Sequence, residues 1–138
     1  MTGSFSDMDN VRDILKTAVE RMSDAGAEFA DARSQSVRVM GASSVNGNLR
    51  QLVEKGTGGV CLRAWSGGRW GYGTVTSFDK DSIMAAADMA VRNASGDGRS
   101  GFTLEPVTVR ADVRAGVRIH PDSVDPSEKV AAVLDIDK

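Results

Sequence analysis

The stretch from Gly56 to Thr76, GTGGVCLRAWSGGRWGYGTVT, constrains the fold more than any other part of the chain. Before Ser66-Gly67-Gly68, the apolar residues Val60, Leu62 and Ala64 alternate with Cys61, Arg63 and Trp65. After it, the aromatic and threonine residues between Trp70 and Thr76 alternate with smaller ones, as side chains do along a strand. Such alternation around a short Gly-Gly turn predicts an antiparallel hairpin. The many flanking glycines indicate bulges, or places where another backbone comes close. Few of these side chains can do chemistry, so the hairpin is interpreted as a framework.

Composition indicates one soluble, cytoplasmic domain. The chain has 138 residues, a formal net charge of -2 and a single cysteine. The charge gives no general attraction to nucleic acid or to an anionic membrane, so neither is expected as a partner. There is no apolar run long enough to span a membrane, and the N-terminus lacks the basic and apolar regions of a signal peptide. One cysteine excludes an internal disulfide and fits a reducing compartment.

The N-terminal part predicts a disordered start followed by a helix. Residues 1–9 are polar and are expected to be disordered. Apolar residues then recur at the spacing of one helical face, and Asp9 or Asn10 can cap the start. Gly26 stands where a left-handed helix stop belongs. We therefore expect the first helix to run from about residue 10 to Gly26.

The next segments predict strands. Residues 27–40 change to a period of two, and 49–55 repeat this pattern after Asn46-Gly47. Asn-Gly is a strong hairpin signal because both residues accept a positive φ at low cost. Together with the Gly-rich hairpin, this predicts an α+β fold with an antiparallel meander of about four strands.

The C-terminal part predicts two helices and one more strand. Asp79 can cap an Ala-rich helix whose small face would pack closely on the sheet. Residues 107–119 are interpreted as a further edge strand, and Asp125-Pro126 opens a last helix with a capping box. The predicted division is a domain over 10–121 and the start of a following helical segment over 122–138. Because that helix stops after a few turns, we expect a truncated piece of a longer protein, with some self-association.

Cys61 and His120 are the first candidates for chemistry. Cys61 could act as a nucleophile with His120 as its base. Packing of Cys61 as a small hydrophobe between Val60 and Leu62 is the favoured interpretation. One His and one Cys cannot build a usual zinc site, which needs three or four ligands. We therefore expect no metal ligand in this chain.

The glycines and the basic and aromatic residues suggest two further kinds of site. A phosphate loop needs a helix directly after its glycines, whereas a strand follows Gly56 to Gly59. Single-stranded nucleic acid could stack on a basic and aromatic face, but the acidic pI and the few other aromatics argue against it. The residues of that possible face are Arg63, Arg69, Trp65, Trp70 and Tyr72.

Five stretches and an Ala-rich helix follow one another in a distinctive order and spacing. The stretches are Ala27–Arg33, Asn46–Leu49, Gly56–Ala64, Trp70–Gly73 and Asp125–Lys129. Taken together, they resemble the N-terminal domain of the TldD/PmbA metallopeptidase family, once described as modulators of DNA gyrase. The resemblance covers nearly the whole chain from about residue 10 and is closer to the TldD type than to the PmbA (TldE) type.

The resemblance implies a non-catalytic part of a zinc peptidase. The family's zinc motif, H-E-x-x-x-H with a later Cys, has no counterpart here, so no catalytic residue is carried over and the chain is predicted to be inactive alone. Zinc would belong to the full-length protein, which cleaves unfolded or short peptides. This domain would support homo- or heterodimer assembly and restrict access of substrate. The alternative is a free-standing protein-interaction domain without a proteolytic role.

The Gly-rich hairpin is the predicted contact surface for a peptide or a partner strand. Its glycines would suit the close approach of another backbone. The candidate contact residues are Gly56, Gly58, Gly59, Arg63, Trp70 and Tyr72. Losing both Gly58 and Gly59 to valine is expected to abolish such binding.

Overall fold

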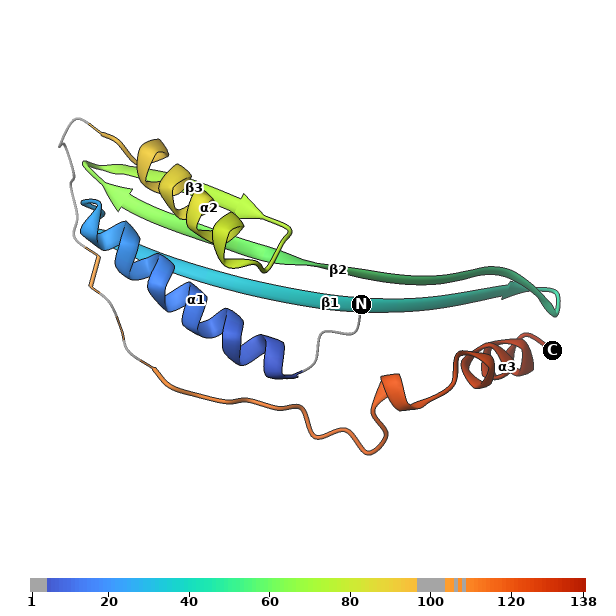
Figure 1. Ribbon diagram of the computed structural model, residues 1–138. Coiled ribbons are helices and arrows are strands. Elements are labelled where there is room, and N and C mark those ends of the chain that lie inside the picture. The colour runs from blue at the N-terminus through green and yellow to red at the C-terminus, as the bar shows by residue number, and fades with distance from the viewer. Residues whose placement is uncertain (1–4, 97–103, 106, 108) are drawn as a thin grey trace. The chain divides into compact units, whose positions relative to one another are not determined.

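The structure is a computed structural model that describes residues 5–96, 104, 105, 107 and 109–138 (Figure 1). It divides into two compact units. The first unit takes residues up to Ser36 and Gly58–Val107, and the second takes Val37–Thr57 and Thr108–Lys138. Among the described helices, none combines the length and the apolar character needed to cross a membrane.

The chain forms helices and one antiparallel sheet, which confirms the predicted α+β class. The sheet has the order β1-β2-β3, so β2 is central and β1 and β3 are its edges. A short 3₁₀ turn, η1, precedes the last helix. The elements are α1 (Phe5–Asp24), β1 (Phe29–Val45), β2 (Asn48–Ser66), β3 (Arg69–Val75), α2 (Lys80–Asn93), η1 (Pro121–Ser123) and α3 (Pro126–Ile136).

The sheet has three strands where the sequence predicts about four. β2 runs without interruption through Gly56–Gly59, so the expected strands over 49–55 and 60–65 are one strand. None of these glycines has a positive φ. The glycine run therefore stays extended and does not break the strand.

Both predicted hairpin turns are confirmed. Asn46 and Gly47 have φ values of 52° and 72°, and Gly67 and Gly68 have values of 56° and 80°. Two successive positive φ values define the type I′ turn, whose twist matches that of the flanking strands. The second turn fixes the register of β2 and β3, from Ser66 opposite Arg69 to Val60 opposite Val75.

The core of the first unit lies between the sheet and two helices. From β2, Val60, Leu62 and Ala64 point into it, and α1 and α2 cover them from the same side of the sheet (Figure 1). Arg21 of α1 and Asp88 of α2 join the helices through Nε–Oδ1 and Nη2–Oδ2 contacts of 2.6 and 2.9 Å. The helical contribution to the core comes mainly from Ala18, Met22, Ile83, Ala86, Ala87, Ala90 and Ala94.

The Ala-rich helix α2 packs directly on the glycines of β3, as expected from its small face. A Cβ atom on Gly71 would stand 2.0 Å from the carbonyl oxygen of Ala90. A Cβ on Gly73 would stand 1.8 Å from the carbonyl oxygen of Ala86. The close backbone approach that the glycines indicate is thus the approach of α2 to β3.

The capping and stop residues predicted from the sequence lie at the observed helix ends, except at the start of α1. Gly26, with φ of 98°, follows α1, as predicted. Asp79 caps α2, and its carboxylate accepts from Ser82 N at 2.8 Å. Hydrogen bonds from the Ser77 hydroxyl and the Ser82 backbone lower the pKa of Asp79 to about 2.

The first helix begins earlier than expected. It starts at Phe5, so residues 5–9 are helical rather than disordered, and Asp9 and Asn10 lie inside the helix. The sequence offers several successive cap-forming residues here, and so does not fix one start.

The second unit combines the outer half of the β1–β2 hairpin with α3. Ser44 Oγ donates to the carbonyl oxygen of Val133 at 3.5 Å, and Gly47 N donates to Asp137 Oδ2 at 2.8 Å. Asp125 caps α3 as predicted, since its carboxylate accepts from Ser127 N at 2.8 Å.

The predicted edge strand over 107–119 is wrong for the residues that the structure describes there. Residues 107 and 109–119 carry no strand, and their side chains are exposed. The sequence alternates there as a strand would, but a strand also needs a partner for its backbone groups. None of the described strands pairs with this segment.

Candidate functional site

The sheet face opposite α1 and α2 in the first unit is here called the open face. Residues that alternate with the core residues Val60, Leu62 and Ala64 belong to it, because successive strand residues point to opposite sides. On β2 and β3 the register pairs Cys61 with Thr74, Arg63 with Tyr72 and Trp65 with Trp70. On β1 its members are Phe29, Asp31, Arg33 and Gln35.

An ion pair between β1 and β2 lies at the centre of the open face. Arg63 Nε donates to Asp31 Oδ1 and Oδ2 at 2.9 and 3.1 Å, and Nη2 also contacts Oδ2. The hydrogen bonds to Asp31 raise the pKa of Arg63. The guanidinium also lies 5.1 Å from the ring centroid of Trp70, within cation–π range. Both side chains are therefore held in place although each is partly exposed.

Aromatic rings continue the open face from this pair. Trp70 contacts Phe29 edge-on at 6.0 Å between centroids, Trp65 at 5.2 Å and Tyr72 at 6.4 Å. Trp65 is only 5% exposed, whereas Tyr72 is 50% exposed. We call Phe29, Trp65, Trp70 and Tyr72 the aromatic cluster. Rings that are packed on one side and exposed on the other are typical of contact surfaces.

A hollow of about 870 Å³ adjoins the ion pair. Asp31, Arg33 and Arg63 line it together with Cys61, and Gly58 and Gly59 contribute backbone without side chains. Arg33 Nη2 donates to the amide oxygen of Gln35 at 3.3 Å. The hollow thus combines charged groups, the hydroxyls of Thr74 and Thr76, and the backbone of two glycines.

The structure brings together most of the predicted contact residues. Arg63 lies beside Trp70 and opposite Tyr72, and Gly58 and Gly59 line the adjoining hollow. Gly56 belongs to the second unit, and a Cβ on it would meet nothing within 4 Å.

Gly58 and Gly59 also have a structural reason to be glycine. A Cβ on Gly58 would stand 2.8 Å from Gln35 O, and a Cβ on Gly59 would stand 2.4 Å from Val75 O. Valine at either position would therefore disturb the sheet itself. The loss of binding expected for such variants would not by itself identify a contact site.

Sequence reasoning missed the contribution of β1. Asp31, Arg33 and Gln35 reach the open face because β1 pairs with β2. Their alternation along β1 places them on one side, but only the pairing of the two strands shows which residues of β2 they face.

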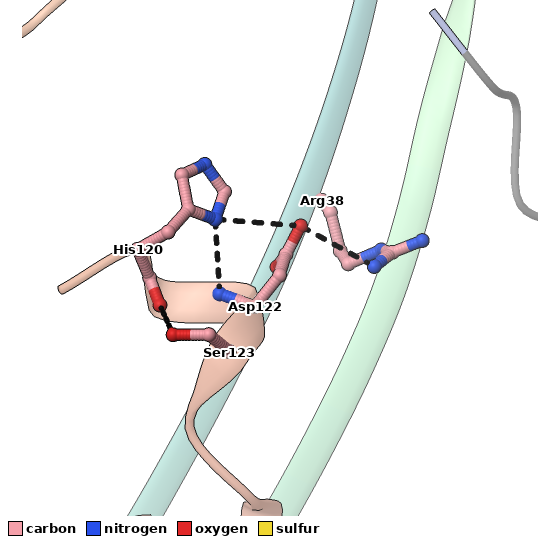
Figure 2. Close-up of polar contacts among 4 residues, drawn as sticks. All are labelled: Arg38, His120, Asp122 and Ser123. Carbon is pink, nitrogen blue, oxygen red and sulfur yellow. Dashed lines mark hydrogen bonds and ion pairs between the residues drawn. The ribbon is translucent and has the colours of Figure 1, made fainter.

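The two candidates for chemistry, Cys61 and His120, belong to different compact units. Cys61 is half-buried in the hollow of the first unit. His120 belongs to the second unit, where its Nδ1 accepts from Asp122 N at 3.3 Å (Figure 2). Ser123 Oγ donates to His120 O at 2.8 Å, and the Asp122 carboxylate lies 3.5 Å from Arg38. The imidazole acts as the cap of η1.

The described residues do not fit a zinc ion. Across residues 5–96, 104, 105, 107 and 109–138, no three His, Cys, Asp or Glu side chains converge as metal ligands would. Zinc in proteins takes three or four such ligands. No step of zinc chemistry is therefore assigned to these residues.

Comparisons with known proteins agree with the fold. The structure is similar to the crystal structure of TldE from Thermococcus kodakarensis, with a TM-score of 0.62 and 15% sequence identity. The match covers 88% of this chain and 28% of that chain, so this chain spans less than a third of the length of TldE. A sequence search of curated proteins gave no match.

The sheet, the two helices on one face and the open face define a small α+β domain of the kind that TldE contains. The family model described as PmbA/TldA metallopeptidase domain 1 matches residues 30–94. Residues 30–94 are thus identified as domain 1 of the PmbA/TldD metallopeptidase family, which confirms the resemblance seen in the sequence. The comparisons do not separate the TldD type from the TldE type, so that preference stays a prediction.

Proposed function

We propose that this chain is the non-catalytic domain 1 of a TldD/PmbA-type zinc metallopeptidase that acts on short or unfolded peptides in the cytoplasm. The match of residues 30–94 to domain 1 carries this proposal. The zinc would be bound by another part of the full-length protein. The open face would contact the peptide or a family subunit in a homo- or heterodimer.

The test is zinc content and peptide cleavage, measured on this chain and on a protein extended through the downstream coding sequence. Zinc and cleavage in the longer protein alone are expected. Cleavage by the short chain would overturn the non-catalytic assignment. Neither property in either protein would overturn the peptidase role.

The role of the open face is tested in the longer protein by Tyr72→Ser. Tyr72 is half-exposed, so its loss should leave the fold intact while it weakens peptide or subunit binding. Lys16→Ser on α1 is the control, since the helices lie on the other side of the sheet. Equal binding by both variants would contradict a contact role for the open face.

The second candidate function is a protein-interaction domain without proteolysis. The partly exposed aromatic cluster favours it, because such rings suit a protein partner whether or not a peptidase follows. The downstream coding sequence separates the two: an H-E-x-x-x-H motif supports the peptidase, and its absence supports the interaction domain.

A further inference from the structure

The two arginines in the hollow differ in how their charge is balanced. Arg63 is held by the Asp31 carboxylate through several hydrogen bonds. Arg33 contacts the neutral amide oxygen of Gln35, and none of the ion pairs among the described residues includes it. Arg33 therefore brings a positive charge into the hollow, and no carboxylate among the described residues forms an ion pair with it.

The surroundings of Arg33 suit an anionic group with one charge. Thr74 and Thr76 are exposed at the same hollow and can donate hydrogen bonds to an anion. Arginine can bind a carboxylate through two parallel hydrogen bonds. Asp31 and Arg63 balance each other's charge, so Arg33 leaves the hollow with one positive charge, which matches a carboxylate better than a doubly charged phosphate monoester.

The size of the hollow suits a short segment of peptide. Gly58 and Gly59 contribute backbone to its lining. The volume of about 870 Å³ lies within the range of small-ligand pockets. Near the ion pair, Tyr72 and Trp70 offer ring surface to an apolar side chain of the ligand.

We propose that the open face binds the carboxyl-terminal end of a short peptide, with Arg33 as the residue that recognises the free carboxylate. The proposal rests on the proposed function, since it names the chemical group by which a peptide would be held. The peptide would then place an apolar side chain near its carboxyl end against the aromatic cluster. Recognition of this kind selects a free end over the middle of a long chain.

The test compares two probes on the full 138-residue chain: the peptide Ala-Ala-Phe-Ala with a free carboxylate, and the same peptide as its carboxyl-terminal amide. Binding is followed by tryptophan fluorescence, because both tryptophans of the chain lie on the open face. The free acid is expected to bind about tenfold more tightly than the amide, as for a hydrogen bond to a charged group. Equal affinity, or no binding of either probe, would overturn the proposal.

Two variants give the matched comparison. Arg33→Gln should bring the affinity of the acid down to that of the amide, whereas Arg12→Gln on α1 should keep the difference. An acid preference that survives Arg33→Gln would also overturn the proposal. If acid and amide bind the chain equally while Tyr72→Ser still weakens binding in the longer protein, only the carboxylate inference fails and the proposed function stands.

Discussion

Gly73 and Ala86 approach so closely that a Cβ atom on Gly73 would stand 1.8 Å from the Ala86 carbonyl oxygen. The contact joins the backbone of β3 to the backbone of α2, with no side chain between them. Gly71 meets the next turn of the same helix at Ala90. The distance between helix and sheet is therefore set by the absence of side chains on β3.

Gly73→Ala is expected to destabilise the first unit strongly. The added methyl group has a backbone atom in its way, and overpacking of this kind costs about 1–3 kcal/mol or more. Urea unfolding followed by circular dichroism would measure the loss. Gly41→Ala is the control, because a Cβ on Gly41 would meet nothing within 4 Å. A Gly73→Ala protein as stable as the control would contradict the contact.

The cap of α2 should make stability depend on pH in a defined window. The folded pKa of Asp79 is about 2, below its ordinary value of 3.8. A carboxylate with a lowered folded pKa stabilises the protein above its unfolded pKa, and this contribution is lost as the pH falls from about 4 to about 2. Asp79→Ala should therefore lower the melting temperature at pH 7 but make little difference near pH 2.

The variant Asp79→Asn separates the effect of the capping hydrogen bond from the effect of the negative charge. Asparagine can still accept from Ser82 N but does not titrate, so the variant should stay folded at pH 7 with a flatter pH dependence. Thermal melts at pH 7, 4 and 2 give the melting temperatures of the original chain, Asp79→Ala and Asp79→Asn. If Asp79→Ala were as stable as the original chain at pH 7, Asp79 would not be the functioning cap.

The Asp31–Arg63 pair should contribute little to stability despite its several hydrogen bonds. The side chains are 33% and 43% exposed, and water and salt screen such pairs, so a double-mutant cycle should give a coupling of about 0.2–1 kcal/mol. The variants are Asp31→Asn, Arg63→Met and the double change, compared by urea unfolding. A coupling well above this range would show that the pair holds the strands together rather than orienting groups on the open face.

Two rings of the aromatic cluster should differ sharply in their effect on stability. Trp65 is almost fully buried, so Trp65→Ala should cost about 3–5 kcal/mol. Tyr72→Ala removes a half-exposed ring and should change the unfolding free energy by about 0.5 kcal/mol. Denaturant unfolding of both variants makes the comparison. Similar losses would mean that Tyr72 supports the fold as Trp65 does.

Local signals in the sequence predicted the local structure well. Asn46-Gly47 and Gly67-Gly68 form the expected turns, and Asp79 and Asp125 cap the expected helices. Each of these depends on a few neighbouring residues, so the sequence alone is enough.

Features that depend on distant residues were harder to predict. The glycines within β2 look like a break in the sequence, but the strand runs through them without interruption. Residues 109–119 alternate like a strand, but no described strand pairs with them. Arg33 enters the candidate site only through the pairing of β1 with β2, which no local pattern encodes.

Cys61 lies half-buried in the hollow and is the single cysteine of the chain. A thiol-reactive dye would therefore attach at one position, on the open face, without any engineered residue. Its rate of attachment depends on how freely the dye reaches the sulfur. Any molecule that covers this face would slow the labelling. The labelling rate of Cys61 therefore shows whether the open face is free or covered.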